Sequence, residues 1–389
     1  MRLIAGGLLL LVHVAAAAGA VRARDLDIPF DGTPGPRNAI TDVAGVEVGE
    51  TTIISGEGSL TVGVGPIRTG VTIVLPRGKN SNAPVFGAWF ALNGTGEVTG
   101  TTYLDEYGLI EGPVALTNTQ SVGTVRDALA AWLTGEKKWE LCCLPIVAET
   151  WDGELNDING FHVRAEDVRG ALRTASAGAV AEGNVGGGTG MVAFGFKGGT
   201  GTASRAVATA VGSYVLGVLV QANMGRREQL LIAGIPVGRE IAAKESALLP
   251  PERGRDSGSI IVIIATDAPL LPHQLKRIAK RASLGLGRTG AIGGDSSGDI
   301  FIAFSTANAQ IVGLQNGDVG VLRNVATLPN DALDPLFEAT IQATEEAIIN
   351  ALVAARTMTG INHRTIVAIP HERIREILEN HHRLEPHER

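Results

Sequence analysis

Glycine is the residue that most constrains how this chain can fold. The sequence holds 51 glycines in 389 residues, about twice the usual share, and they follow no collagen-like period. The densest run is Gly183-Asn184-Val185-Gly186-Gly187-Gly188-Thr189-Gly190, and Lys197-Gly198-Gly199-Thr200-Gly201-Thr202 follows it. Because glycine lacks a Cβ, such runs suit turns where two backbones, or a backbone and a ligand, approach closely. We therefore expect closely packed backbone turns at both runs.

The glycine runs also resemble phosphate-binding loops, but their details argue against a nucleotide site. No Gly-Lys-Ser/Thr sequence closes a P-loop, and no GxGxxG motif opens a helix after a strand. The net charge of −7 and the lack of a Lys/Arg stripe argue against a nucleic-acid partner.

The first 20 residues are predicted to be a cleaved secretory signal. Arg2 precedes an apolar run over 3–18 that ends in small residues. This run is shorter than the ~20 residues of a membrane span, so we expect export to the periplasm or medium rather than anchoring. The two cysteines, Cys142 and Cys143, are adjacent and do not suit an ordinary disulfide with each other.

Apolar runs and helical periodicity predict strands that interleave irregularly with helices. This order favours stacked sheets with helical layers outside them over a βαβ ladder. Strands are expected at 46–48, 71–75, 84–91, 144–148, 214–222, 229–235, 260–265 and 299–304, with a hairpin turn at 223–227. Helices are expected at 124–133, 165–176, 271–284 and 335–352, the last with Asp334 as N-cap and Pro335 as first residue.

Ser259 stands where an exposed loop, 246–258, meets the β-branched run 260–265. Such a run is typical of a strand covered on both faces. A strand packed in this way fixes the position of the Ser259 hydroxyl where the strand begins. Gly258 leaves the Gly258–Ser259 carbonyl open to attack by that hydroxyl. If this bond breaks, the new α-amino group of Ser259, with a pKa near 7.7–8.0, can serve as the base. Position alone still favours a strand-capping serine.

The segment 293–299 is the second candidate for chemistry. It places two hydroxyls and two carboxylates in a glycine-lined bend before a strand, where one of each could orient a nucleophile. Gly294-Asp295-Ser296-Ser297-Gly298 also fits the GxSxG elbow of α/β-hydrolases. That elbow needs a strand before the serine and a helix after it. The order here is a loop and then a strand, so we reject the elbow.

The histidines do not favour a metal site. His371 begins an HExxH pattern, but Arg375 stands where the second histidine is needed. Three further histidines are better explained as tail residues: His381, His382 and His387. We expect no metal and no cofactor.

Six groups of residues, spread over nearly the whole mature chain, carry a resemblance to a known family. They are 38–46, 93–97, 149–153 with 155–157, 182–190, 258–259 with 265–270, and 298–299 with 303–306. In these segments the chain resembles the DmpA-like aminopeptidases, which include L-aminopeptidase/D-amidase-esterases and β-peptidyl aminopeptidases. Many long matches in the same order make the resemblance specific.

The resemblance implies an α+β fold, a single four-layer αββα sandwich. Its layering is similar to that of the N-terminal-nucleophile (Ntn) hydrolases, with a different connectivity that ornithine acetyltransferases share. It also implies a precursor that cuts itself before Ser259 into an α chain, 21–258, and a β chain, 259–389, of one domain. Homo-oligomers of αβ units are expected, with no membrane contact after signal cleavage.

Matching positions imply the roles of the catalytic residues. Ser259 is expected to be the nucleophile, supported by the hydroxyl of Ser297 and the carboxylate of Asp299. Asn223, at the end of its strand, is expected to donate to the oxyanion.

Two further positions concern the substrate. Glu149 is expected to hold its free ammonium group, because binding –NH₃⁺ in a desolvated pocket requires a partner charge. Some family members carry a tyrosine, thought to help the oxyanion, where this chain has Trp151. Since an indole offers only an N–H, the second oxyanion donor and the substrate preference stay open.

The sequence therefore predicts an exported serine aminopeptidase. It would hydrolyse N-terminal aminoacyl amides, esters or short peptides through an acyl-enzyme, with the choice among L-, D- and β-amino acids undecided. One alternative is acyl transfer as in ornithine acetyltransferases, which self-cleave before threonine; Ser259 and the signal segment argue against it. The other is a non-catalytic exported binding protein whose glycine loops shape a pocket.

Overall fold

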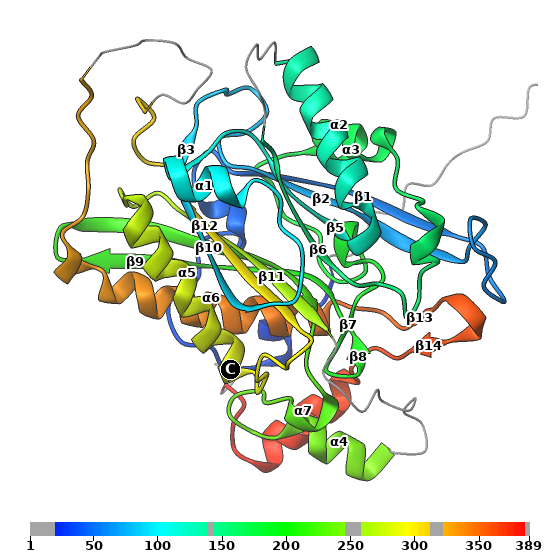
Figure 1. The fold of residues 1–389 in the computed structure, drawn as a ribbon. Helices are drawn as coiled ribbons and strands as arrows, with labels where there is room; N and C mark the ends of the chain where they lie inside the picture. Colours follow the sequence, from blue (N-terminus) through cyan, green and yellow to red (C-terminus); the bar gives the residue numbers. More distant parts are fainter. Residues whose placement is uncertain (1–19, 138–143, 246–257, 312–321, 386–389) are drawn as a thin grey trace, which may run out of the picture.

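The computed structural model describes residues 20–137, 144–245, 258–311 and 322–385 (Figure 1). The predicted signal segment up to residue 19, both cysteines, residues 246–257 and His387 lie outside these ranges. No helix within the described ranges is long and apolar enough to cross a membrane.

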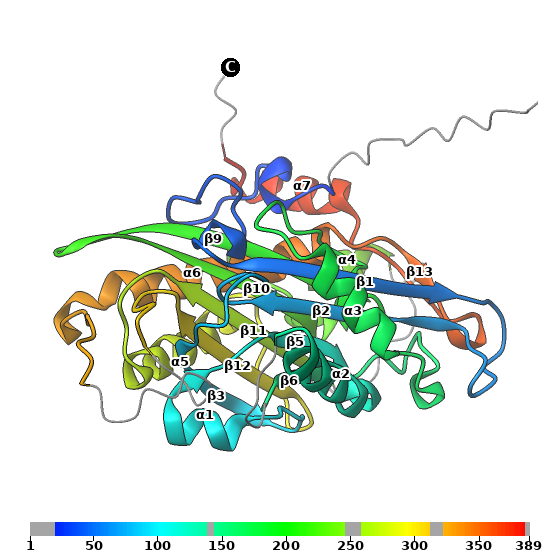
Figure 2. The same cartoon turned by 90° about the horizontal axis from the view of Figure 1, so that it is seen from above.

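Two stacked sheets form the centre of the molecule (Figures 1 and 2). One has the strand order β4-β3-β12-β11-β10-β9 and the other β1-β2-β5-β6. The strands of the first are β3 (Val85–Gly94), β4 (Leu109–Ile110), β9 (Gly199–Thr209), β10 (Gly212–Asn223), β11 (Ser259–Thr266) and β12 (Gly298–Ser305). Those of the second are β1 (Glu47–Ser55), β2 (Ile67–Leu75), β5 (Val114–Asn118) and β6 (Ile146–Thr150). Two small hairpins pair β7 (Val192–Ala193) with β8 (Phe196–Lys197) and β13 (Met358–Thr359) with β14 (Thr365–Ile366).

Helices cover the outer face of each sheet. Helices α2 (Val122–Gly135) and α3 (Ala165–Thr174) share an apolar core with β2, β5 and β6. Helices α5 (Pro272–Arg288) and α6 (Asp334–Val353) share another with β10, β11 and β12. A third core fills the space between the sheets. The predicted four-layer αββα sandwich is confirmed. The remaining helices are α1 (Thr101–Tyr107), α4 (Val237–Glu245) and α7 (His371–Asn380).

Strand β11 explains why a continuous β-branched run occurs at 260–265. Every residue of the strand is buried. Alternate side chains enter the two cores, because successive residues of a strand point to opposite faces. Ile261, Ile263 and Ala265 contact the core between the sheets, and Ile260, Val262 and Ile264 contact the helix-covered core. The prediction of a strand covered on both faces is correct.

The first glycine run is a tight turn at close backbone approach, as predicted. A Cβ on Gly187 would lie 2.0 Å from Oε1 of Gln221, and one on Gly188 would lie 2.3 Å from the Thr200 nitrogen. The second run is not a turn, because it enters β9. Within β9, a Cβ on Gly201 would lie 2.1 Å from the Ala347 carbonyl oxygen. Glycine there lets α6 pack directly on the sheet.

Three further local predictions were wrong. The segment 229–235 is not a strand: it follows a 3₁₀ turn, Arg227–Gln229, and holds only an isolated bridge between Ile232 and Ile235. Its buried Leu230 and Ile232 join the core from a loop, and a short apolar run does not distinguish these cases. The hairpin partner of β10 is instead β9, which precedes it. Asp334 is the first residue of α6 rather than its N-cap.

Candidate active site

The ends of three neighbouring strands meet at Ser259. Ser259 begins β11 and pairs with Asn223, the last residue of antiparallel β10. It also pairs with Gly298, the first residue of parallel β12. The Gly298 N–H donates to the Ser259 hydroxyl oxygen at 3.2 Å, and the side chain is buried. We call Ser259, Asn223 and Gly298 the strand-end site.

Gly258 occupies a position that only glycine fits. A Cβ built there would lie 1.8 Å from the Asn223 carbonyl oxygen and 2.7 Å from Cα of Met224. The peptide before Ser259 is therefore pressed against the end of β10. Glycine at position 258 is therefore needed for packing, as well as for access to the Gly258–Ser259 carbonyl.

Ser297 and Asp299 flank Gly298 and are completely buried. The Ser297 hydroxyl donates to Oδ1 of Asp299 at 2.7 Å. The structure thus brings together four of the predicted residues at neighbouring ends of the inner strands β10, β11 and β12: Ser259, Asn223, Ser297 and Asp299.

The segment 93–97, formed by the end of β3 and the loop after it, holds these strand ends in place, although no role was predicted for it. Nδ2 of Asn93 donates to the carbonyl oxygens of Gly294 and Asp295 at 2.5 and 3.1 Å. A Cβ on Gly298 would lie 2.6 Å from the Thr95 carbonyl oxygen. The loop therefore packs on the start of β12. The only sequence signal for it was its appearance among the matched segments.

Glu149 belongs to the other sheet and is separated from the strand-end site by Gly96. It lies on β6, is 4% exposed, and accepts hydrogen bonds from the Thr119 hydroxyl and, at 3.0 Å, from the Glu97 N–H. A Cβ on Gly96 would lie 3.2 Å from Oε1 of Glu149 and 3.4 Å from Cα of Gly298. Gly96 thus lies between the carboxylate and the strand-end site. Burial raises the pKa of Glu149, so its charged form is poorly compensated by the protein.

The Asn223 amide is fixed at both ends. Its Oδ1 accepts a hydrogen bond from the Val192 N–H at 2.7 Å, and its Nδ2 donates to the Trp151 carbonyl oxygen at 2.9 Å. Trp151 thus contacts Asn223 through its backbone. The sequence indicates only the indole of Trp151, because a contact made by the backbone cannot be inferred from the type of residue.

Two buried ionisable residues near Asn223 were missed from the sequence. Asp152 and Lys197 are completely inaccessible to solvent. Burial raises the pKa of Asp152 to about 7 and lowers the pKa of Lys197 to about 7. Lys197 belongs to the second glycine run, for which the sequence predicted only a turn.

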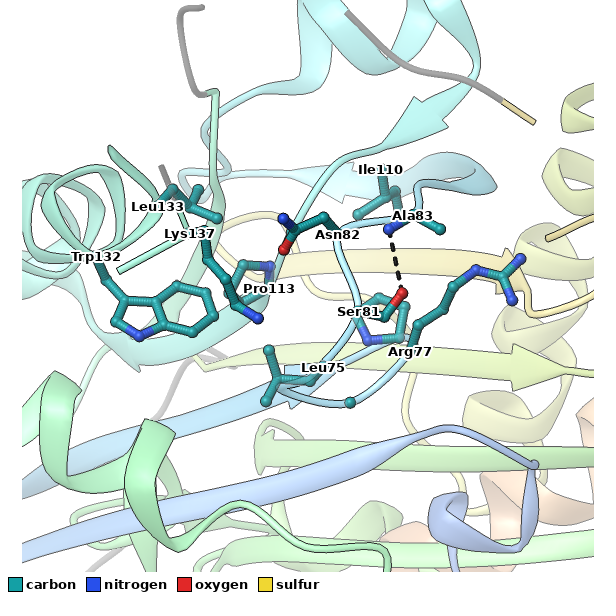
Figure 3. A pocket seen from close by; sticks show the side chains of 13 residues that line it. Leu75, Arg77, Ser81, Asn82, Ala83, Ile110, Pro113, Trp132, Leu133 and Lys137 are labelled. Carbon is teal, nitrogen blue, oxygen red and sulfur yellow. Dashed lines mark hydrogen bonds between the residues drawn. The ribbon is translucent and has the colours of Figure 1, made fainter. Parts of the chain in front are cut away.

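A hollow beside α2 contains none of the predicted residues (Figure 3). Its lining includes Leu75, Arg77, Trp132 and Lys137, and its internal space of about 20 Å³ suits roughly one water molecule. In the described ranges, no group of three or more His, Cys, Asp or Glu residues is arranged to hold a metal ion.

Comparison with known proteins gives matches over nearly the whole chain. The model of peptidase family S58 matches residues 38–366. A β-peptidyl aminopeptidase of Sphingosinicella microcystinivorans is 56% identical over 387 residues, covering 96% of each chain. Another, of Sphingosinicella xenopeptidilytica, is 47% identical over 381 residues, covering 95% of this chain and 94% of the relative.

Solved structures show the same fold. The L-aminopeptidase D-Ala-esterase/amidase of Ochrobactrum anthropi, described as a prototype of the serine aminopeptidases and a variant of the Ntn hydrolase fold, superimposes with a TM-score of 0.85 at 46% identity. The match covers 94% of this chain and 99% of the Ochrobactrum chain. A β-aminopeptidase of a Burkholderia species gives the same TM-score and identity, over 92% and 99%. The chain is therefore an enzyme rather than a binding protein: it belongs to peptidase family S58 and is a serine aminopeptidase of the Ntn-hydrolase type.

Proposed function

We propose that the chain cuts itself between Gly258 and Ser259, and that the freed Ser259 is the nucleophile of the aminopeptidase. The observation that supports this most is the strand-end geometry. The Ser259 hydroxyl lies against the Gly298 N–H, and the Gly258 peptide packs on the backbone of Asn223. A serine at the start of a completely buried strand is held rigidly, as a nucleophile must be.

The proposed reaction uses two groups of Ser259. Its α-amino group takes the hydroxyl proton while the oxygen attacks the carbonyl carbon of the substrate's first residue. Collapse of the tetrahedral intermediate breaks the C–N bond, and the leaving amine receives the proton. Water then attacks the acyl-enzyme and gives a proton to the α-amino group of Ser259. That group passes the proton to the serine oxygen as the ester bond breaks, and the first residue leaves with its new carboxylate.

Neighbouring groups stabilise the charges in this scheme. An amide NH₂ carries two donors, and that of Asn223 gives one to Trp151 and the other to the oxyanion. The Ser297 hydroxyl, oriented by Asp299, supports the nucleophile by hydrogen bonding. Glu149 binds the substrate's ammonium group. The carboxylate supplies the negative charge that an ammonium group needs when it is buried away from water.

We propose peptides with an N-terminal β-amino acid as the preferred substrates. Support comes from the two relatives at 56% and 47% identity, both β-peptidyl aminopeptidases. The Ochrobactrum structure, at 46% identity, makes L-α-aminoacyl amides the second candidate. Turnover of matched β-homoalanyl and L-alanyl p-nitroanilides compares the two directly.

We further propose that residues 1–20 direct export and that the mature enzyme consists of chains 21–258 and 259–389, assembled as oligomers of αβ units. The sequence of the signal segment supports export. Mass spectrometry of protein recovered from the periplasm or medium identifies both new N-termini.

Replacement of the nucleophile tests the proposal. We expect wild-type protein to run as two chains on denaturing gels, and Ser259→Ala to run as one chain without aminopeptidase activity. Ser305→Ala is a matched control, because Ser305 is a buried serine at the opposite end of β12 and should leave both properties intact. An unsplit wild-type chain with full activity, or an active Ser259→Ala enzyme, contradicts the mechanism.

A further inference from the structure

Lys197 holds one end of a peptide unit that contacts Asn223. From β8 its Nζ donates to the carbonyl oxygens of Met191 and Gly198 at 2.7 and 2.8 Å, and to that of Gly188 at 3.4 Å. The Met191 carbonyl and the Val192 N–H belong to the same trans peptide, so they point in opposite directions. The N–H end donates to Oδ1 of Asn223 at 2.7 Å. Ammonium, peptide and amide therefore form one continuous hydrogen-bonded chain.

Asp152 has the corresponding place on the other side of the amide. Its N–H shares a peptide unit with the Trp151 carbonyl, which accepts from Nδ2 of Asn223 at 2.9 Å. The Asp152 carboxylate is fixed by Asn118 and Asn156, whose amides donate to it at 3.1 Å each. Its negative charge also attracts the Lys197 ammonium.

The two charges act on the amide in the same direction. The ammonium of Lys197 is linked to Oδ1 through the peptide 191–192, and the backbone of Asp152 is linked to Nδ2 through the peptide 151–152. Hydrogen-bonded chains in a low-dielectric interior polarise one another. Each charge therefore increases the positive character of the NH₂ group, which is what an oxyanion donor needs.

Accepting the proposed role of Asn223, we propose that Lys197 and Asp152 are two buried charged residues that position and polarise the Asn223 amide. Neither side chain touches the reacting atoms, so both are positioning residues. Their effect passes through two peptide units, 191–192 and 151–152, which meet on one amide.

A double-mutant cycle tests this role. Lys197→Met keeps the apolar stem and removes the charge. We expect its kcat to fall about tenfold to a hundredfold, less than the 10²–10³ expected when a whole oxyanion donor is lost, as in Asn223→Ala. KM should stay within about twofold, because the ammonium site at Glu149 is untouched. In the Asn223→Ala background, Lys197→Met should cause no further loss of kcat.

Two variants separate this effect from simple destabilisation. Asp152→Asn keeps the shape and removes the charge, should lower kcat in the same way, and carries the test if Lys197→Met does not fold. Arg205→Met removes a buried cation far from the strand-end site, and should lower the thermal midpoint but not kcat. An unchanged kcat in folded Lys197→Met or Asp152→Asn, or equal losses with and without Asn223, overturns the proposal. Full activity of Asn223→Ala instead overturns the assigned role of Asn223.

Discussion

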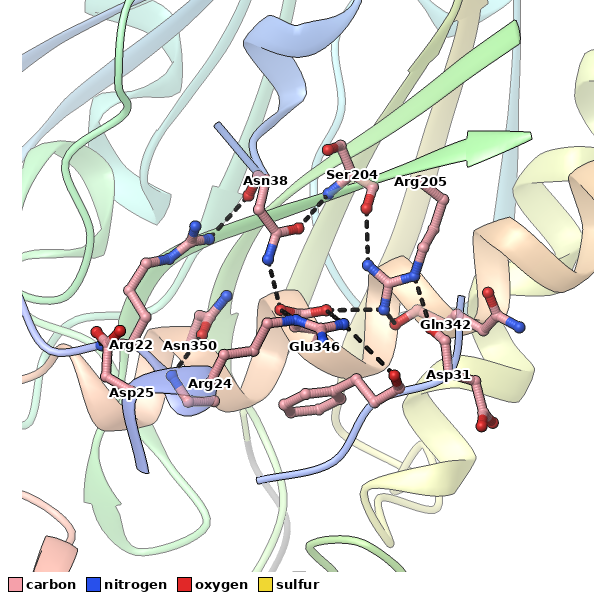
Figure 4. Close-up of polar contacts among 12 residues, drawn as sticks. Arg22, Arg24, Asp25, Asp31, Asn38, Ser204, Arg205, Gln342, Glu346 and Asn350 are labelled. Atoms are coloured by element: carbon pink, nitrogen blue, oxygen red, sulfur yellow. Dashed lines mark hydrogen bonds and ion pairs between the residues drawn. The ribbon is translucent and has the colours of Figure 1, made fainter. Parts of the chain in front are cut away.

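Two buried carboxylates, Glu346 and Glu149, show two different uses of charge. Glu346 on α6 is completely buried and forms ion pairs with Arg24 at 2.8 Å and Arg205 at 2.7 Å (Figure 4). Glu149 is nearly as buried, but the hydrogen bonds described around it come from a hydroxyl and a backbone N–H. The fold neutralises the first carboxylate itself. In the proposed function, the second is neutralised by the substrate's ammonium group.

The pKa values of the two groups move in opposite directions. Burial acts to raise the pKa of Glu346, but the hydrogen bond from Arg24 and the charge of Arg205 prevail and lower it. Its contribution to stability is present above the ordinary carboxyl pKa and is lost as pH falls through the lowered value. At Glu149 burial prevails and raises the pKa. That contribution is present at low pH and is lost as pH rises through the raised value. At neutral pH Glu346 therefore stabilises the fold, whereas the charged form of Glu149 costs stability. In the proposed function, the bound substrate ammonium recovers that cost.

The largest effect is expected from Glu149→Gln. Breaking a buried charge pair costs about 3–5 kcal/mol, so kcat/KM should fall by roughly a hundredfold to a few thousandfold. The thermal midpoint at neutral pH should not fall, because the substitution removes an uncompensated charge. Steady-state kinetics and thermal unfolding measure the two quantities. A substrate analogue without the amino group is the control, and it should lose nothing further. A full loss with that analogue would contradict the assignment.

The opposite pattern is expected from Glu346→Gln. The substitution leaves Arg205 buried without its carboxylate, so the free energy of unfolding should fall by about 3 kcal/mol. We place the loss at the low end of the range because the Arg24 side chain is 27% exposed. Urea unfolding measured in the single-chain Ser259→Ala background avoids dissociation of the two chains. Activity is measured with Glu346→Gln alone, which keeps Ser259. At a temperature where this variant is folded, its kcat/KM should be unchanged, and a loss of activity without a loss of stability would invalidate the comparison.

The pH dependence of kcat/KM sharpens the same comparison with a smaller effect. Below its raised pKa, Glu149 is protonated and no longer attracts the ammonium group, so kcat/KM should fall up to tenfold per pH unit. Glu149→Gln should lack this limb and keep the one due to the Ser259 α-amino group. Profiles of the two enzymes, measured between pH 5 and 9 on one substrate, test this expectation. Parallel acid limbs would mean that another group controls binding.

How far the sequence predicted this molecule depends on the kind of contact. The run 260–265 and the Gly258-Ser259 pair identified the central strand and its mouth, because burial on both faces leaves a strong pattern. Strand β9 was missed because its glycine, threonine and serine residues resemble a turn. The irregular order of strands and helices favoured stacked sheets with helices outside them, and the family resemblance specified the four layers.

The candidate site was predicted only as far as residue type reveals it. The bend 293–299 was found because hydroxyls and carboxylates stand out beside a strand, and the family resemblance singled out Ser297 and Asp299 within it. The link from Lys197 to Asn223 runs through a backbone peptide, and a backbone peptide is the same for every residue type. Such links become visible only when the hairpin β7–β8 is placed against β10.

The smallest effect is expected at Trp151, where the chain departs from some relatives. The contact with Asn223 uses the Trp151 carbonyl, so the amide stays fixed when the ring is changed. Trp151→Phe removes the indole N–H, and we expect kcat to change by less than about tenfold, since loss of a true oxyanion donor costs 10²–10³. Trp151→Tyr is the matched control, because it offers a hydroxyl instead. If only the phenylalanine variant loses a hundredfold or more in kcat, the ring supplies the second donor, and the amide of Asn223 does not act alone.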